Sequence, residues 1–346
     1  MEPNSPSARL IVALVYVALC AVMVSACQRA KPGVRDVTAY VSADRPFSEP
    51  ILKEYERQSG VRVNVAYDTE ETKSTGLANR LIAEKGRPQA DVFWSNEPVR
   101  TLVLKSRGVL APYQSAAADG IAATFKDPDG YWTGFSARMR AIVYNTSKVK
   151  AGEAPRSVFD LADPRWKGQV AIADPRFGST SFHVAALYAE LGDARADEFF
   201  RKLKANDVKI VDGNSVVRDL VARGDVLVGL TDTDDVNVAL EARQPVAMVL
   251  PDRDGLGVPV MPNMVSLIAG APHADEGKRL IDYLLSANVE RKLAASDAVQ
   301  IPLHEGVSGP KNMPAIDTFK PMTLDYAKAA GRVDDVTNRL ASILGL

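Results

Sequence analysis

Apolar and polar positions follow two different periods in the first third of the chain, and the two periods alternate. Short runs at residues 36–43, 61–67 and 90–94 have the pattern of strands. Their apolar residues either alternate with polar ones or form a continuous apolar run. Helical spacing fills the intervals, with Ser48 as a cap and Gly60 as a stop, then residues 75–86, then Pro98 to Gly108. Repeated strand, helix, strand units predict a parallel sheet with helices on both faces.

A long extended segment, residues 131–145, separates this series from a second one. The second series alternates strands at 168–175, 208–213, 225–230 and 245–251 with helices at 179–192, 215–224 and 235–243. A stretch rich in proline and glycine, 252–270, then returns to the first series, and 274–286 is an amphipathic helix. The pattern therefore predicts two α/β lobes joined by two extended crossings, with a cleft between them.

Composition agrees with a folded, two-lobed protein. The chain has 346 residues, of which 46% are hydrophobic and 25% are charged, and its formal net charge is −1. This charge provides no general attraction to nucleic acid, and we find no basic tract with interleaved aromatic residues. We expect no nucleic-acid partner and a monomeric chain.

The N-terminus has the features of a secretory signal. Arg9 precedes an apolar run at residues 10–24, and the following "VSAC" resembles the bacterial lipobox, in which the thiol is lipidated. We expect residues 1–26 to be a signal peptide, Cys27 to carry lipid, and residues 27–36 to be a tether. An uncleaved anchor is the alternative, but the run is shorter than the roughly 18 to 20 apolar residues that a span needs.

Cysteine and histidine usage excludes several classes of site. Cys20 lies in the segment to be removed and Cys27 would be lipidated, so the mature chain has no disulfide, cysteine nucleophile or Cys-based zinc site. The three histidines, His183, His273 and His304, are widely spaced and form no HExxH motif. We expect no resident cofactor.

The stretch "VGLTDTDDVNVAL" is the strongest candidate for a site. Asp232 would end a parallel strand, where open α/β sheets place their ligands. Asp234 or Asp235 would stand at the start of a helix, where a carboxylate either caps free N–H groups or contacts a ligand. The stretch lacks the glycine and terminal glutamate of an EF-hand.

A second candidate group would bind an anion. Gly178, Ser179 and Thr180 begin a helix, where backbone N–H groups and hydroxyls can cradle a phosphate or simply cap the helix. Arg138 and Arg140 share one face of the crossing segment and could hold a phosphate or lie in solvent. Weaker candidates are Ser42, Asn145 and Arg218.

Several stretches, taken in order, resemble the periplasmic solute-binding proteins typified by ferric-iron binders. They include "YVSADRPFSEPILKEYERQSGVRV", "ADVFWSNEPVRTLVLKSRGVL", "DPRFGSTSFHVAAL" and "GLGVPVMPNMVSLIAGAPH", and the resemblance runs from about residue 37 to 303. It implies a type II periplasmic binding protein fold, with the ligand in a hinged cleft and no chemistry performed on it. One lobe would comprise 37–135 and about 263–320, and the other 136–262 and a C-terminal helix at about 321–346.

The resemblance also implies partners and site residues. The partners would be the permease and ATPase of an ABC importer. Iron-binding members hold the metal with an early histidine, a glutamate and two adjacent tyrosines, because hard Fe³⁺ favours oxygen ligands. The early loop here is Ser42, Ala43 and Asp44, without a histidine, while Glu97 matches the glutamate. The tyrosine positions hold Asp234 and Asp235, so an Fe³⁺ site would use Glu97, Asp234 and Asp235, with Asp44 as a further oxygen donor.

An anion cradle beside carboxylates suggests a ligand that carries both charges. The expected ligand-binding residues are Ser42, Asp44, Glu97, Arg138, Gly178, Ser179, Thr180, Asp232, Asp234 and Asp235. Fe³⁺, an aminoalkylphosphonate and a sugar phosphate are the candidate ligands, and bare phosphate fits poorly beside three carboxylates. The alternatives are a ligand-sensing lipoprotein for a membrane receptor and a metal-dependent hydrolase, although no nucleophile elbow or Walker loop is found. We expect the protein in the periplasm or on the outer face of a bacterial membrane.

Overall fold

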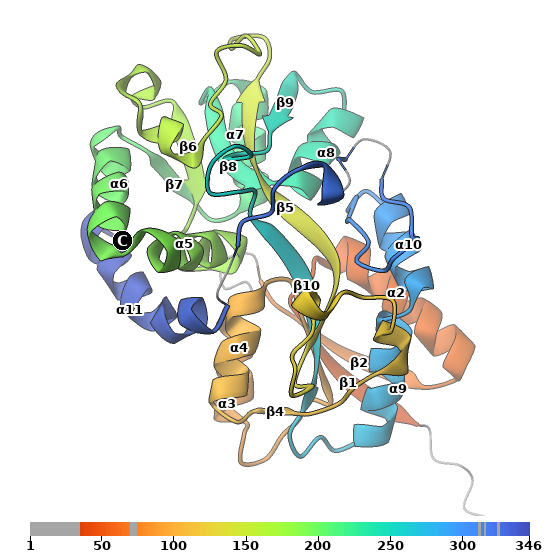
Figure 1. Ribbon diagram of the computed structural model, residues 1–346. Coiled ribbons are helices and arrows are strands. Elements are labelled where there is room, and N and C mark those ends of the chain that lie inside the picture. Colours follow the sequence, from red (N-terminus) through yellow and green to blue (C-terminus); the bar gives the residue numbers. More distant parts are fainter. Residues whose placement is uncertain (1–34, 70–74, 311–312, 315, 324–325) are drawn as a thin grey trace, which may run out of the picture. The chain divides into compact units, whose positions relative to one another are not determined.

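The computed structural model describes residues 35–346, except 70–74, 311, 312, 315, 324 and 325 (Figure 1). The predicted signal peptide, Cys27 and all but the last two residues of the predicted tether lie outside the described residues. Residues 36–346 form one compact unit, which is described below by itself. No helix among the described residues combines the length and apolar character needed to cross a membrane.

One continuous sheet runs through residues 36–346. Its order is β2-β1-β3-β10-β5-β8-β6-β7, with β4 paired to β10 and β9 paired to β5. The strands are β1 (Asp36–Val41), β2 (Arg62–Tyr67), β3 (Val92–Ser95), β4 (Leu110–Ala111), β5 (Thr133–Asn145), β6 (Val170–Ala173), β7 (Lys209–Val211), β8 (Val228–Asp232), β9 (Val246–Val249) and β10 (Val260–Ile268).

Helices cover both ends of this sheet. They are α2 (Arg45–Ser59), α3 (Thr75–Ala83), α4 (Pro98–Ser106), α5 (Gly178–Leu191), α6 (Asp193–Ala205), α7 (Asn214–Arg223), α8 (Thr233–Glu241), α9 (Ala274–Leu284), α10 (Ala287–Ala295) and α11 (Tyr326–Leu344). Sequence patterning missed α6, although Phe199, Phe200 and Leu203 lie buried along one of its faces.

Helix α2 begins earlier than predicted. Asp44 is its N-cap residue, and the Ser48 hydroxyl donates to the carbonyls of Ala43 and Asp44 at 3.2 and 3.0 Å. The prediction of Ser48 as the cap is therefore wrong. Pro46 explains the earlier start, because its fixed φ and missing N–H suit the first helical turn.

The sheet is parallel within each half and antiparallel where the chain crosses. Strand β1 pairs in parallel with β2 and β3, and β6 pairs in parallel with β7 and β8. In contrast, β10 runs antiparallel to β3 and β5, and β5 runs antiparallel to β8 and β9. This reversal is expected of strands that carry the chain from one α/β series to the other and back.

Strand β5 joins the two series, because Thr133 to Met139 pair with β10 and Arg140 to Asn145 pair with β8 or β9. All its residues are buried. Figure 1 shows β5 and β10 passing through the middle of this unit, between β1–β4 and β6–β9. The lobe boundaries expected near residues 136 and 263 fall inside these two strands.

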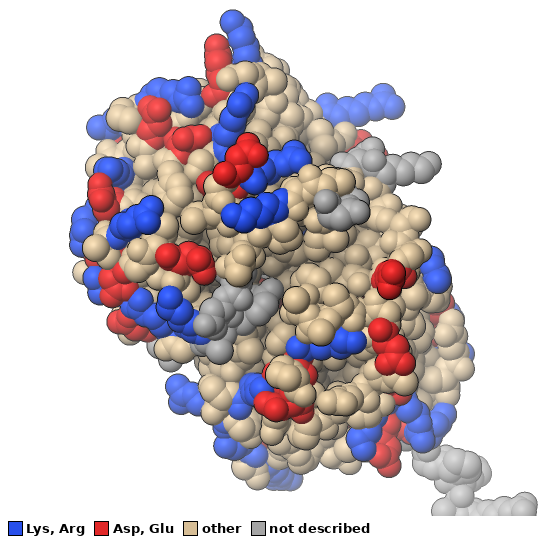
Figure 2. Space-filling view, viewed as in Figure 1, with Lys and Arg blue, Asp and Glu red and all other residues tan. Residues whose placement is uncertain are grey.

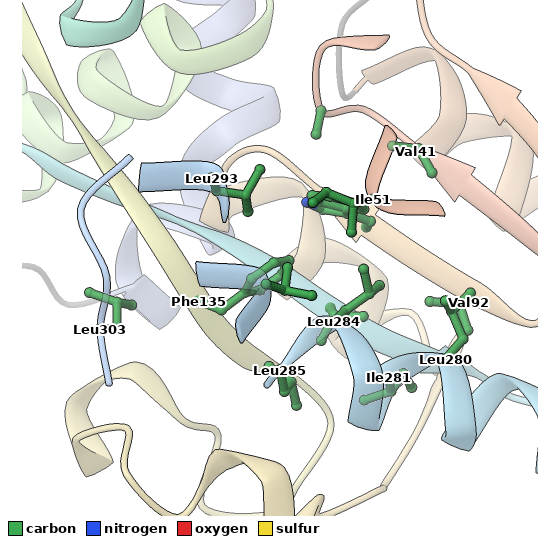
Figure 3. Close-up of a cluster of buried hydrophobic side chains, with 14 of the residues drawn as sticks. Val41, Ile51, Val92, Phe135, Leu280, Ile281, Leu284, Leu285, Leu293 and Leu303 are labelled. Carbon is green, nitrogen blue, oxygen red and sulfur yellow. The ribbon is translucent and has the colours of Figure 1, made fainter. Parts of the chain in front are cut away.

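Each half has its own apolar core. In the first half, Phe135 of β5 and Leu284 of α9 are fully buried together with Val41, Ile51 and other side chains (Figure 3). Burying one such side chain contributes about 1.5–3 kcal/mol. A second cluster surrounds β6 and β8 and includes side chains of α5, α6 and α11. The ends of the strands are thus held by packed cores on both sides of the crossing.

Helix α11, expected with the second lobe, also contacts the first. It packs against α5 and α6, and also against α4. Ala329 and Val333 of α11 share an apolar cluster with Val99 of α4 and Phe182 of α5. The C-terminal helix therefore connects the two halves on one side of the crossing strands.

Candidate functional site

Three helices begin at the same edge of the sheet. Strands β6, β7 and β8 are parallel and end at Ala173, Val211 and Asp232, and each is followed by a helix, α5, α7 and α8 respectively. The carboxyl ends of parallel strands are where open α/β sheets place their ligands. The three helix N-termini also bring unpaired N–H groups and positive dipole ends to this edge.

A buried ion pair lies directly behind these helix starts. The Asp232 carboxylate accepts from Arg138 Nε at 3.0 Å and from Arg140 Nη1 at 2.6 Å, and the Asp232 side chain is 3% exposed. The Ser179 hydroxyl and the Asn214 amide donate to the same carboxylate at 2.6 and 3.0 Å. The sheet creates this arrangement, because Arg140 of β5 pairs in register with Asp232 of β8.

These contacts control the protonation of Asp232. Burial opposes ionisation, but the Arg140 and Arg138 guanidiniums and the Ser179 hydroxyl outweigh it, so the pKa of Asp232 lies below its usual value of 3.8. A lowered pKa means that the ion pair stabilises the fold above the unfolded value of 3.8. The stabilisation is lost as the pH falls through the lower pKa of the folded state.

A small inner cavity opens in front of the ion pair. Its volume is about 60 Å³. It is lined by the starts of α5, α7 and α8, by Arg138, and by two residues of the first half, Asp44 and Asn96. The described lining residues include six aspartates, Asp44, Asp174, Asp212, Asp232, Asp234 and Asp235, but only one arginine, Arg138.

A larger outer cavity adjoins the inner one. Its volume is about 470 Å³. Its described lining residues are Ser42, Ala43, Asp44, Arg45, Pro46, Phe47, Tyr67, Asp68, Ser215, Arg218, Asp234, Asp235, Val238 and Asp297. Asp44, Ser215, Asp234 and Asp235 line both cavities, so these four residues stand at the junction. Because Asp44 precedes α2 and the other three belong to α7 and α8, the junction is shared by the two halves.

The three aspartates around the start of α8 form a compact cluster. Asp232, Asp234 and Asp235 each offer a carboxylate oxygen within 4.8 Å of the others, an arrangement that can hold a metal ion. Asp235 also accepts from the Thr231 hydroxyl at 3.3 Å and lies 3.6 Å from Arg218. Asp234 and Asp235 lie in the first turn of α8, while its N-cap residue, Asp232, makes no cap hydrogen bond.

Of the other acidic and hydroxyl candidates, some line the cavities and one does not. Asp44 lines both cavities, and Ser42 lines the outer one while its hydroxyl donates to Asp68 at 2.7 Å. Glu97 lines neither cavity, because its carboxylate accepts from the backbone N–H groups of Val99 and Arg100 and caps α4. Burial raises the pKa of Glu97.

The start of α5 lines the inner cavity, but its hydroxyls face the ion pair. The Ser179 and Thr180 hydroxyls accept from Arg140 at 3.0 and 3.3 Å. The groups that this helix start can offer a ligand are therefore the backbone N–H groups of Gly178, Ser179 and Thr180, which have no acceptor within the helix.

Figure 2 shows charges of both signs interspersed over one face of the molecule.

Several lining residues were not singled out by the sequence. Asn96, Asn214 and Ser215 line the inner cavity, and Phe47 and Tyr67 line the outer one. Asn214 and Ser215 open the helix after β7, just as Gly178 opens the helix after β6, so the repeated strand-helix turn was a usable signal. Of the weaker candidates, Arg218 lines the outer cavity. The Asn145 amide instead binds the Val221 carbonyl at 2.8 Å.

The His183 side chain lies close behind the ion pair in the apolar interior of the second half. Within the described residues neither ring nitrogen has a hydrogen-bond partner, and burial, with the Arg140 charge, lowers the pKa of His183 to about 3. A histidine with a lowered pKa stabilises the fold above its unfolded value of 6.5, and this stabilisation falls as the pH decreases below 6.5.

We therefore expect a His183→Phe variant to lose less stability on acidification. Between pH 7 and pH 5 the wild-type protein should lose about 2 kcal/mol more of its free energy of unfolding than the variant. Urea denaturation of both proteins at the two pH values measures the difference. Equal losses in the two proteins would contradict the buried neutral state of His183.

Comparison with known proteins shows which proteins this chain resembles. A family model described as bacterial extracellular solute-binding protein matches residues 88–330. The chain is 25% identical over 304 residues to the iron uptake protein A1 of Synechocystis sp., covering 85% of this chain and 83% of that protein. It is also 25% identical over 240 residues to a putative 2-aminoethylphosphonate-binding periplasmic protein of Salmonella typhi, covering 64% and 69%.

Two solved structures share the fold. Iron-bound HitA of Pseudomonas aeruginosa superposes with a TM-score of 0.80 at 21% identity, covering 88% of this chain and 99% of that one. AfuA of Actinobacillus pleuropneumoniae, with fructose-6-phosphate bound, also gives a TM-score of 0.80, at 23% identity, covering 90% and 99%. These likenesses confirm the predicted periplasmic binding protein fold.

Proposed function

The chain belongs to the bacterial extracellular solute-binding proteins, and we propose that it captures a ligand with a positively charged centre for an ABC importer. The family binds solutes and does not transform them. A relative of Sinorhizobium fredii, 27% identical over 282 residues, is named a probable ABC transporter periplasmic-binding protein. The partners proposed here are accordingly a permease and its ATPase.

One observation indicates that the ligand has a positive charge. Asp44, Asp234 and Asp235 line both cavities and approach the junction from the two halves. The adjacent Asp232 is already neutralised by Arg138 and Arg140. An anion placed at the junction would meet carboxylates from both sides, whereas a cation would receive several charge-assisted contacts.

Ferric iron is the first candidate for this centre. Carboxylate oxygens suit a hard cation, and Asp234 and Asp235 of the compact cluster, together with Asp44, can supply them. The names of the Synechocystis relative and of the Pseudomonas aeruginosa structure both refer to iron. Glu97 was included in the expected metal set, but its capping contacts favour Asp44 as the contribution of the first half.

An aminoalkylphosphonate is the second candidate, and a specific feature of the inner cavity favours it. The first residues of α5 and α7 line this cavity together with Arg138, and the N–H groups of a first helical turn have no acceptor within the helix. They are suited to a phosphonate group. The ammonium group of the same molecule would then reach the carboxylates at the junction. A sugar phosphate can use the same anion contacts but provides only hydroxyl donors for the aspartates.

We also propose that the protein is a lipoprotein. The "VSAC" sequence, which ends at Cys27, would place a diacylated cysteine at the membrane surface, in the periplasm or on the outer face of a bacterial membrane. A single lipid chain binds a membrane only marginally, so two acyl chains are needed for a stable anchor. Mass spectrometry of the membrane fraction should find Cys27 as the modified N-terminus, and an unmodified residue 27 would contradict this.

Calorimetry of the mature protein without its lipid tests the ligand. The titrants are Fe³⁺ supplied as a soluble chelate, 2-aminoethylphosphonate and glucose 6-phosphate, with inorganic phosphate as the control. We expect saturable binding of one molecule per chain for a titrant with a positive centre and weaker binding of phosphate. Preference for phosphate, or absence of binding by these titrants and by the aliphatic amines described below, would contradict the proposal.

A further inference from the structure

From the outer cavity we infer that the ligand is an organic cation of the aliphatic amine class, not a bare metal ion. The inference deepens the proposed function and rests on it, because the amine would use the same junction carboxylates. An ammonium group would contact Asp44, Asp234 and Asp235, and the carbon chain would extend into the outer cavity.

The size of the outer cavity is the first reason. A metal ion and its oxygen ligands are separated by about 2.0–2.6 Å, so an ion bound at the junction needs little space beyond it. The outer cavity of about 470 Å³ instead falls within the roughly 300–1,000 Å³ typical of small-molecule sites. The inner cavity, at about 60 Å³, has room for one small group only.

The walls of the outer cavity are the second reason. Pro46, Phe47, Tyr67 and Val238 provide apolar surface from both halves. A bare ion gains nothing from such surface, whereas each buried CH₂ group of a carbon chain contributes about 0.8 kcal/mol. The Tyr67 ring already accommodates one cation, because the Arg45 guanidinium lies 5.4 Å from its centroid.

The charge of the outer cavity selects an amine over an organic anion. The described lining residues include five aspartates, Asp44, Asp68, Asp234, Asp235 and Asp297, and two arginines, Arg45 and Arg218. Both arginines are already engaged with carboxylates. Arg45 binds Glu49 at 3.0 Å, and Arg218 binds Asp219 at 2.8 Å and also lies 3.6 Å from Asp235. Asp297 lies apart from the junction in sequence and comes from the segment after α10. Aspartates therefore outnumber arginines in the lining of the cavity and come from both halves, which suits a chain that carries ammonium groups.

Calorimetry with putrescine and spermidine tests the inference, with Fe³⁺ chelate and 2-aminoethylphosphonate measured beside them. We expect at least one of the two amines to bind saturably, one molecule per chain, and more tightly than Fe³⁺. Binding of Fe³⁺ or of 2-aminoethylphosphonate without binding of either amine would overturn the inference and leave the proposed function standing. Absence of binding by every cationic titrant would overturn both.

A pair of variants locates the bound chain. Val238→Phe fills the outer cavity while retaining every junction carboxylate, and Val216→Phe is the matched control on the exposed side of α7. We expect Val238→Phe to weaken amine binding at least 10-fold and Val216→Phe to leave it within twofold. Circular dichroism establishes that both variants fold. An unchanged amine affinity in folded Val238→Phe would contradict the outer cavity as the site of the chain.

Discussion

Replacing Arg140 with methionine is expected to lower the free energy of unfolding by about 3–5 kcal/mol. Arg140 is fully buried, and its guanidinium contacts Asp232, Ser179 and Asn214 at 2.6, 3.0 and 3.2 Å. Methionine fills a similar volume but leaves the Asp232 carboxylate buried with only Arg138 as a charged partner. Urea denaturation at pH 7, followed by circular dichroism, measures the loss.

The control for this experiment is an exposed ion pair. Arg223 binds Asp225 at 2.9 Å, with the two side chains 59% and 48% exposed. Arg223→Met should change the free energy of unfolding by less than about 1 kcal/mol, because solvent screens such a pair. A loss in Arg140→Met no larger than that in the control would show that the buried network does not stabilise the fold.

The double substitution Asp234→Asn and Asp235→Asn is expected to weaken binding of a cationic ligand by about 100-fold or more. Each charge-assisted contact is worth about 1.5–3 kcal/mol, and both aspartates line the two cavities at their junction. The affinity is measured by calorimetry with the titrant that binds the wild-type protein most tightly. Folding should survive, since each carboxylate at the start of α8 contributes only about 0.3–1 kcal/mol through the helix dipole.

Asp275→Asn is the matched control. This aspartate also lies in the first turn of a helix, α9, but its side chain is 85% exposed and it lines neither cavity. We expect its affinity for the same titrant to equal that of the wild-type protein. If the double variant, correctly folded, binds within threefold of wild type, the junction carboxylates are not the cation site.

Local sequence patterns were sufficient for most of the secondary structure. The period-two run at 61–67 became β2, and the cap-to-glycine interval before Gly60 became α2, displaced by one turn. Helix α6 was missed because its apolar face begins immediately after Gly192, where the preceding helix was expected to end. A single glycine marks the end of the first helix, but no loop sequence follows it to indicate that a second helix begins.

The site was only partly predictable for a different reason. Gly178, Ser179 and Thr180 were expected at the start of a helix and lie in the first turn of α5. The expectation that Ser179 or Thr180 caps this helix is wrong, because Phe177 is the N-cap residue and no side chain caps the helix. The choice between a ligand role and a structural role for Arg138, Arg140 and Glu97 depended on which residues lie opposite them. Those neighbours are distant in sequence, as with Arg140 and Asp232, which meet only through the antiparallel pairing of β5 and β8.

The sequence by itself determined the alternation of strands and helices, the two extended crossings and the position of Asp232 at a strand end, because these depend on contacts between near neighbours in the chain. The tertiary structure alone decided which carboxylates line the two cavities together. Asp232 is neutralised by two arginines of β5, whereas Asp44 joins Asp234 and Asp235 across the two halves. The physical reason is that the charge a ligand meets is a sum over groups brought together by folding, and no local pattern contains that sum.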